Sequence, residues 1–231
     1  VNITVTDDQT RSLITKWVAY ALKSRICLYE GTFRKYHTEL NLQSTANDWL
    51  TEAADAAQQV MTSGKFSLNQ AGGSTKSYRQ LFISTAAVTN EDILIDVTDP
   101  NLAVFIDANW YWTSSTYGNR LSFDRTFVNT YLNINGTPFT SIPGHETMTF
   151  PVETQNRDGR LQQTIRTPGY TRIDGGSVIP APPDFTYTFT GYMPIKYSLD
   201  DTKYDQATVS INSVPVIRYA EMLLNYAEAK E

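Results

Sequence analysis

The sequence predicts a mainly α-helical fold, in which helix pairs carry a large loop-rich region and a few short strands. Apolar residues recur at helical spacing near both ends of the chain. The long middle segment is instead rich in Gly, Pro, Ser, Thr and aromatic residues. The last helix repeats the tripeptide Tyr-Ala-Glu at a spacing of seven. With 41% hydrophobic and 19% charged residues, the composition is that of a globular protein.

The first predicted helix begins near Thr6, because Thr6-Asp7-Asp8-Gln9 fits a capping box with Thr6 as N-cap. We expect this helix to end near Gly31 and Trp17 to lie in the core. The single cysteine, Cys27, is expected to be buried and inert. The apolar positions at roughly helical spacing are Ile14, Trp17, Val18, Ala21, Leu22, Cys27 and Tyr29.

The second predicted helix begins after Ser44-Thr45 and ends at Ser63-Gly64, where glycine suits a left-handed C-cap. It carries Trp49, which we expect in the core, and several alanines. Two antiparallel helices with small residues at their crossing form a unit of the tetratricopeptide type. Residues 1–64 are therefore predicted to form one helix pair.

Residues 65–212 are predicted to be largely ordered loop. Ile93–Val97 has the composition of a short strand. The alternating segment Tyr131–Ile134 meets Asn135-Gly136, a strong hairpin-turn signal, and Pro180–Pro183 predicts a rigid extended connector. Long ordered loops on a helical scaffold usually carry the function.

Residues 213–231 are predicted to start a further scaffold helix after Pro215. The spacing of seven places Tyr219 and Tyr226 on one face, and Ala220 with Ala227 likewise. Two stacked alanines allow close approach of a second helix. Since no Gly, Asn or Pro follows to end the helix, the sequence is expected to be part of a longer protein.

Charge and hydropathy exclude several classes of function. The formal net charge is -5, and no run of Lys and Arg forms a nucleic-acid footprint, so we expect no nucleic-acid partner. No stretch is long and apolar enough to predict a transmembrane helix. A single cysteine cannot form an internal disulfide, and it leaves the compartment open.

A series of short motifs, in order along nearly the whole chain, resembles the SusD/RagB family of outer-membrane glycan-binding lipoproteins. Each motif is weak alone, whereas the ordered set is specific. The motifs are Lys23–Phe33, Ala53–Ala57, Ser63–Leu68, Phe127–Tyr131, Asn135–Phe139, Asn156–Leu161 with Thr164-Ile165, Thr190-Gly191-Tyr192, Lys196-Tyr197, Ile217–Glu221 and Tyr226–Lys230.

The resemblance implies a single SusD-like domain over residues 1–231, as a fragment of a longer protein. Family members have tetratricopeptide-like helix pairs that support an irregular region. They are lipoproteins of Bacteroidetes, anchored at the outer membrane and facing outward. They bind oligosaccharide or polysaccharide, are not enzymes, and pair with a TonB-dependent transporter of the SusC type. The lipidated cysteine that would attach the protein to the membrane is not among these residues.

Sugar rings have apolar faces and hydroxyl-bearing edges, so a binder needs flat aromatic rings together with Asn, Asp, Arg or Gln. The best local match is the stretch from Asp107 to Arg120. If it is extended, Trp110 and Trp112 share one face and Tyr111 points away. The alternative is that the two tryptophans pack the loops onto the helices. The expected ligand contacts are Asn109, Trp110, Tyr111, Trp112, Tyr117 and Arg120.

Two further sets of residues are weaker candidates for ligand contact. Tyr170, Tyr187 and Tyr192 lie in loop-like sequence and are further candidates for ligand contact. Asp158, Arg160 and Arg218 lie in the family-like motifs, where ion pairs or helix caps are expected. These two sets come from the loop-rich region and the last predicted helix.

We expect no catalytic residue, no cofactor and no metal site. Acidic pairs such as Asp200-Asp201 and Glu91-Asp92 could supply the carboxylates of a glycosidase, but such pairs arise by chance in an acidic chain. His37 and His145 are isolated. A loop-bound Ca²⁺ stays open. The alternative function is a tetratricopeptide-like protein-interaction scaffold, or a peptide-binding importer subunit without glycan affinity.

Overall fold

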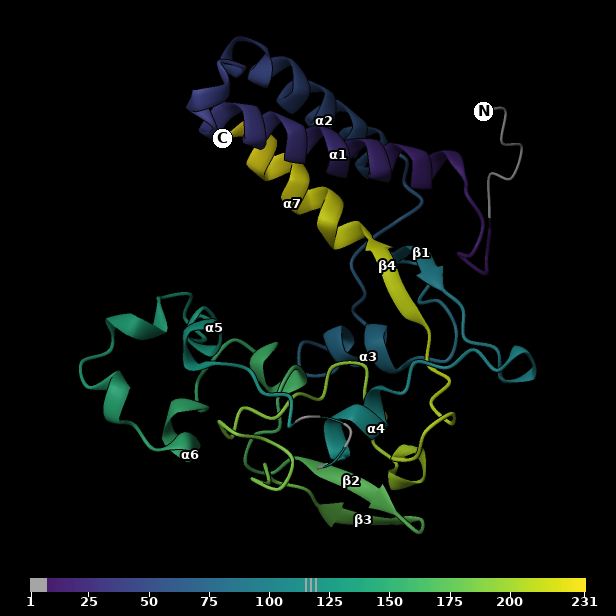
Figure 1. Cartoon of the computed structure of the whole chain (residues 1–231), viewed down its shortest axis with the longest axis vertical. Coiled ribbons are helices and arrows are strands. Elements are labelled where there is room, and N and C mark those ends of the chain that lie inside the picture. The colour runs from purple at the N-terminus through teal and green to yellow at the C-terminus, as the bar shows by residue number, and fades with distance from the viewer. Residues whose placement is uncertain (1–7, 115, 117, 119) are drawn as a thin grey trace. The chain divides into compact units, whose positions relative to one another are not determined.

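A computed structural model describes residues 8–114, 116, 118 and 120–231 (Figure 1). The chain divides into two compact units, each described by itself. We call residues 8–69, 86–97 and 215–231 the helical unit, and residues 70–85 and 98–214 the loop-rich unit. The described part contains seven α-helices and four short strands and is 42% helical, which confirms the mainly α fold class.

Three helices pack side by side in the helical unit, α1 (Lys16–Tyr36), α2 (Ala46–Met61) and α7 (Tyr219–Lys230) (Figure 1). The helices α1 and α2 are antiparallel, since the C-terminal half of α1 packs on the N-terminal half of α2. Buried alanines on α2 let the two helices approach closely. The buried residues of this core are Val18, Ala21, Cys27, Leu28, Leu50, Ala53, Ala57, Val60, Phe66, Ile93, Ile217 and Met222.

The first helix begins later than the capping-box pattern predicts, and Thr6 lies outside the described residues. The N-cap is Thr15, whose Oγ1 accepts a hydrogen bond from the backbone N–H of Val18 at 3.4 Å. The Asp8 carboxylate instead holds a turn, because it accepts from the N–H of Thr10 at 3.0 Å and of Leu13 at 2.7 Å. Residues 8–13 therefore form a turn rather than helix.

The predicted end of the first helix at Gly31 is also wrong, because α1 continues to Tyr36. Gly31 is buried where α1 crosses α2. A Cβ atom there would lie 2.7 Å from Leu50 Cδ2 and 3.0 Å from the Leu50 backbone nitrogen. The glycine thus allows close packing in the helix interior instead of ending the helix. The end of α2 at Ser63-Gly64 is confirmed, with Thr62 as C-cap and Gly64 at φ 67°.

The last helix, α7, is confirmed, but it buries a different face from the one expected. Ala227 is exposed, whereas Met222 and Asn225 are buried and the two tyrosines pack against the core. Asn225 Nδ2 donates to Ser24 Oγ on α1 at 3.3 Å. Large and polar side chains, not an alanine pair, therefore make the contact of α7 in the described part of the helical unit.

A two-stranded sheet pairs β1 (Asp92–Asp96) with β4 (Val214–Arg218). The strand expected at Ile93–Val97 is confirmed, and it begins and ends one residue earlier than expected. The strand β4 was not expected, because Pro215 looks like the lead-in to a helix. The buried Glu91 carboxylate joins the elements, since it accepts from Arg218 Nη1 at 2.7 Å and from the Asn69 N–H at 2.6 Å.

The loop-rich unit is built on short helices and turns around its own core. That core consists of Val128, Leu161, Ile165 and Tyr192, with Phe123, Tyr131 and Phe150 packed against it. No described helix, in either unit, combines the length and the apolar character needed to cross a bilayer. The helices and strands are α3 (Ser77–Ile83), α4 (Ala108–Thr113), α5 (Arg125–Asn129), α6 (Phe150–Glu153), β2 (Thr171–Asp174) and β3 (Ser177–Pro180).

Two glycine turns shape the loop-rich unit. The predicted turn at Asn135-Gly136 forms, with Gly136 at φ 83° and its N–H bonded to the Asn133 carbonyl at 2.9 Å. It does not close a hairpin, because Asn133 forms an isolated bridge with Arg157. The hairpin lies instead at Gly175-Gly176, where positive φ values of 53° and 84° join β2 to β3.

Candidate functional site

The aromatic stretch expected to contact sugar forms a helix, not an extended strand. Residues Ala108–Thr113 form α4, so the shared face that an extended stretch would give Trp110 and Trp112 does not arise. Residues two apart on a helix point about 200° apart. The turn before the helix is held by Asp107, at φ 52°, whose Oδ1 accepts from the Thr208 N–H at 2.7 Å.

Two of the expected contact residues have structural roles, because their side chains bond to a neighbouring loop. Asn109 is fully buried, and its amide bonds to the Leu199 N–H at 2.6 Å, the Leu199 carbonyl at 2.9 Å and Asp205 Oδ1 at 3.1 Å. Trp112 is half-buried, and its indole N–H donates to the Lys196 carbonyl at 2.8 Å. Both side chains thus fix the loop that follows Ile195 in the sequence.

The other expected contacts differ in exposure. Tyr111 is exposed, and its ring lies 5.5 Å from that of the half-buried Trp110. The Arg120 guanidinium lies over the Phe189 ring, 5.3 Å from its centroid. Tyr117 lies outside the residues that the structure describes. Tyr111 is therefore the exposed aromatic residue among the described residues of this stretch.

A pocket with aromatic walls lies elsewhere in the loop-rich unit, with a volume of about 470 Å³. We call it the aromatic pocket. Its rings are Phe150 on α6, Phe185 from the loop after β3, and Tyr192 from the Thr190-Gly191-Tyr192 turn. The lining residues are Arg125, Phe150, Pro151, Glu153, Pro168, Pro182, Pro183, Phe185, Thr190, Gly191 and Tyr192.

Backbone geometry places Tyr192 in this wall. Gly191 adopts φ 83°, which favours glycine, and turns the chain so that the Met193 N–H reaches the Gly191 carbonyl at 2.9 Å. The Tyr192 carbonyl accepts from the Phe123 N–H at 3.1 Å, and Thr190 Oγ1 donates to the Phe123 carbonyl at 2.7 Å. The backbone that carries the Tyr192 ring is thus fixed on both sides of Gly191.

Charged and hydroxyl groups line one edge of the aromatic pocket. Arg125 Nε donates to the Tyr192 hydroxyl at 3.2 Å, and Arg125 Nη2 lies 3.5 Å from the buried Glu153 carboxylate. Arg125 Nη1 also donates to the Glu146 carbonyl at 2.7 Å. Burial raises the pKa of the Tyr192 hydroxyl above its usual value. Flat apolar rings and hydrogen-bonding groups therefore meet in one cavity.

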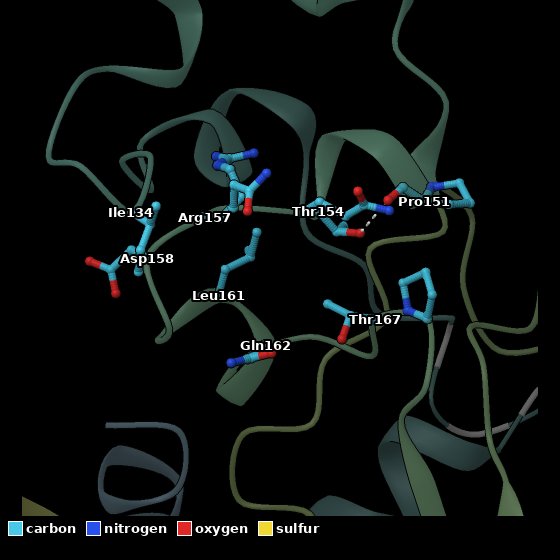
Figure 2. A pocket seen from close by; sticks show the side chains of 11 residues that line it. Ile134, Pro151, Thr154, Arg157, Asp158, Leu161, Gln162 and Thr167 are labelled. Atoms are coloured by element: carbon cyan, nitrogen blue, oxygen red, sulfur yellow. Dashed lines mark hydrogen bonds between the residues drawn. The ribbon is translucent and has the colours of Figure 1, made fainter. Parts of the chain in front are cut away.

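A second pocket, the polar pocket, shares Pro151 and Pro168 with the aromatic pocket and has a volume of about 450 Å³. Figure 2 shows Thr154 and Arg157 along one side and Gln162 and Thr167 along the other. Thr154 Oγ1 lies 3.5 Å from the Pro151 carbonyl (Figure 2). The lining residues are Ile134, Pro151, Thr154, Gln155, Asn156, Arg157, Asp158, Leu161, Gln162, Thr167 and Pro168.

Not every polar group in this lining is available to a ligand. Arg157 donates to the carbonyls of Glu153, Val128 and Tyr131 at 2.7 to 2.9 Å, and its guanidinium lies 3.7 Å from the Phe139 ring centroid. Burial lowers the pKa of Arg157. It is a structural cation.

The expected ion pairs of the motif residues are confirmed. Arg160 pairs with Asp158 at 2.5 Å, and that hydrogen bond lowers the pKa of the Asp158 carboxyl. Arg218 pairs with Glu91 at 2.7 Å. The polar pocket is therefore left with amide and hydroxyl side chains as its accessible hydrogen-bonding groups.

A third pocket, of about 560 Å³, shares Gln162, Thr167 and Pro168 with the polar pocket and contains Tyr170. The Tyr170 hydroxyl donates to Asp200 Oδ1 at 2.5 Å, and Arg79 pairs with the same oxygen at 2.5 Å. Burial raises the pKa of Tyr170.

Two of the weaker candidate tyrosines therefore lie in pocket walls, Tyr192 in the aromatic pocket and Tyr170 in the third. Tyr187 is half-buried and is not part of these walls. Among residues 8–114, 116, 118 and 120–231, no three His, Cys, Asp or Glu side chains group as metal ligands would.

Sequence reasoning missed the aromatic pocket because its walls come from separate segments near residues 125, 150, 168, 183 and 191. Residues 185–192 are rich in aromatic residues, namely Phe185, Tyr187, Phe189 and Tyr192, but nothing in their spacing indicates that Phe150 and Arg125 lie beside two of them. The sequence contains two signals for the pocket, the family-like motif Thr190-Gly191-Tyr192 and the place of Tyr192 among the further candidates for ligand contact. A cluster assembled by loops leaves no spacing that can be recognised along the chain.

Comparison with known proteins bears on this site. The model of the SusD family matches residues 68–231, a range that contains every residue of these pockets. The search of curated proteins and the search of solved structures each found no match. Members of the family are known as non-catalytic glycan-binding proteins of the cell surface with a tetratricopeptide-like helical fold. This chain belongs to the SusD family.

Proposed function

We propose that this protein binds an oligosaccharide without breaking any bond and delivers it to a SusC-type TonB-dependent transporter at the bacterial outer membrane. The observation that carries the proposal is the aromatic pocket, in which Phe150, Phe185 and Tyr192 stand beside hydrogen-bonding groups. The polar pocket adjoins it and offers further amide and hydroxyl groups. The two pockets together suit a short run of sugar residues.

The chemistry of sugars explains why this combination fits. The C–H face of a pyranose ring packs on an aromatic ring, while its hydroxyl edge needs donors and acceptors. Pro151 and Pro168 form the wall that both pockets share, and their rigid rings keep it in place. Among the described residues of the aromatic pocket, Glu153 supplies the carboxylate, whereas glycoside hydrolysis uses two flanking carboxyl groups.

The test is a loss of affinity in Phe185→Ala. Phe185 is 70% exposed, so removal of its ring leaves the core intact. By analogy with base–aromatic stacking, the loss of one stacked ring should weaken glycan binding by roughly 5- to 150-fold. Isothermal titration calorimetry, with a glycan first identified on an array, measures this change.

Phe189→Ala is a matched control. Phe189 is 68% exposed, lies four residues from Phe185, and is not part of the aromatic pocket wall. Its replacement should leave the affinity unchanged. Equal affinity of wild type and Phe185→Ala would contradict the proposed pocket.

The surface of α4 remains a competing proposal for the contact. Tyr111→Ala and the double variant Trp110→Ala/Trp112→Ala test it in the same assay. Loss of binding in Tyr111→Ala with full binding in Phe185→Ala would move the site to α4. Tyr111→Ala is the cleaner variant, because Trp112 also donates to the Lys196 carbonyl.

Delivery to a transporter rests on the known partnership of the family with SusC-like proteins. A lipid anchor and a place at the cell surface rest on the same ground. Co-purification with a SusC-type transporter from the same organism tests the partnership. Binding to the transporter, or to peptides, without any glycan affinity would favour a protein-interaction role instead.

A further inference from the structure

A fourth cavity, next to the aromatic pocket, has a buried arginine in its wall. This cavity, which we call the arginine pocket, has a volume of about 560 Å³ and shares Pro182, Pro183 and Phe185 with the aromatic pocket. Arg166 is only 7% exposed. The lining residues are Arg166, Arg172, Ile179, Pro180, Ala181, Pro182, Pro183, Asp184, Phe185 and Thr202.

The Arg166 guanidinium is poorly bonded for a buried cation. Its Nη1 lies 3.5 Å from the Ala181 carbonyl and 3.4 Å from the Pro182 carbonyl, both at the long limit of a hydrogen bond. Its Nε is buried with no partner, a feature it shares with Arg157 and Arg172, so the long contacts of Nη1 are what set it apart. Within the part of the chain that the structure describes, no carboxylate lies within 4.0 Å of it. Its nearest ring is Tyr170, with the centroid at 5.6 Å.

Two other buried arginines of the same unit are well bonded. Arg157 donates to three carbonyls at 2.7 to 2.9 Å. Arg172, in the wall of the arginine pocket, pairs with both oxygens of Asp205 at 2.6 Å. The fold can therefore satisfy a buried guanidinium, and Arg166 is an exception that lines a cavity.

The neighbouring acids do not neutralise Arg166. Asp205 is already bound by Arg172. Asp184 is exposed, beyond ion-pair distance, and its Oδ1 accepts from the Thr186 N–H at 2.7 Å. Burial has the largest effect and lowers the pKa of Arg166. The nearby groups therefore do not fully offset the cost of burying its charge in the free protein. An uncompensated buried charge is costly unless a partner arrives.

We propose that Arg166 binds the anionic group of an acidic sugar residue, so that the ligand is an acidic oligosaccharide. This inference rests on the proposed function, because Phe185 lines both cavities and would stack on the sugar beside the acidic one. A planar guanidinium matches a carboxylate through two parallel hydrogen bonds. A sulfate ester offers the same acceptors, and the experiment separates the two sources.

The experiment measures affinity on an array of polygalacturonate, alginate, hyaluronan and chondroitin sulfate. Each polymer is also presented in its carboxyl-reduced form, and chondroitin sulfate in its desulfated form as well. Wild type should prefer one acidic polymer over its neutral form by about 10- to 100-fold. Arg166→Gln should lose this preference and keep the affinity for the neutral form.

Each outcome decides something. Loss of preference on carboxyl reduction identifies a uronate, and loss on desulfation identifies a sulfated sugar. Equal binding of both forms by wild type overturns the anion subsite and leaves oligosaccharide binding intact. A preference that survives in Arg166→Gln overturns the role of Arg166. Binding to neither the acidic nor the neutral forms overturns the anion subsite and the proposed function together.

Thermal stability distinguishes a ligand group from a structural one. If Arg166 is a ligand-binding group, its charge is unpaired in the free protein. In the absence of ligand, Arg166→Gln should then melt at the same temperature as wild type or at a higher one, because an unpaired buried charge is removed. Arg157→Gln is the control and should melt lower, since three carbonyls lose their donor. An equal fall for both variants would contradict the proposal.

Discussion

The buried carboxylate of Asp92 makes the stability of the helical unit depend on pH. Asp92, the first residue of β1, is fully buried. One carboxylate oxygen accepts from the Val88 N–H at 2.7 Å, and the other has no partner among the described residues. Burial raises its pKa from the ordinary value of 3.8 to about 6, and Glu91 adds to the rise while Arg218 and Arg11 oppose it.

The sign and the size follow from this shift. Between pH 3.8 and about 6 the Asp92 carboxyl binds more protons in the folded protein than in the unfolded chain, so its contribution to stability is largest at low pH and is lost as the pH rises. The two pKa values differ by about 2.2 (6 minus 3.8). At about 1.4 kcal/mol for each pKa unit, the stability lost by pH 7.5 is about 3 kcal/mol.

The assay compares wild type with Asp92→Asn by urea unfolding at pH 4.5, 6.0 and 7.5. The amide cannot titrate, so the difference in unfolding free energy between variant and wild type should rise by a few kcal/mol across this range in favour of the variant. Any fixed cost of the amide cancels, because it is the same at each pH. A difference that stays constant with pH would refute the reasoning.

Two further variants test the packing. Gly31→Ala should lower the unfolding free energy by about 1–2 kcal/mol, because the clash with Leu50 exceeds the gain in helix propensity of about 1 kcal/mol; a more stable variant in urea unfolding would show that α1 and α2 separate easily. Asn109→Ala should cost about 3 kcal/mol, since the buried Leu199 N–H and carbonyl lose their partners. A melting temperature equal to that of wild type would mean that Asn109 is not an anchor.

The helical unit was largely predictable because its helices are amphipathic and locally encoded. The limits of α1 were not predictable. A glycine in the sequence can either end a helix or allow a close approach, and at Gly31 it allows the close approach of Leu50. The buried face of α7 was also misjudged. Small residues permit close packing, but Met222 and Asn225 are the ones that meet the core in the described structure.

The loop-rich unit was predictable in kind but not in detail. The β2–β3 hairpin follows from two glycines in positive φ, yet the same pair of glycines also occurs at Gly72-Gly73, which forms no hairpin. The segment around Trp110 is helical because tertiary bonds from Asn109 override local preference. The aromatic pocket depends on contacts between distant segments, which no periodicity records.

The central claim is that sugar binds in the aromatic pocket, and mapping of chemical shifts by nuclear magnetic resonance tests it most directly. The full chain is labelled with ¹⁵N and with ¹³C in its aromatic rings, and is titrated with the glycan identified on the array. The account predicts shifts at the rings of Phe150, Phe185 and Tyr192 and at the Thr190 and Gly191 amides. Shifts confined to residues 108–113, with these signals unmoved, would contradict it.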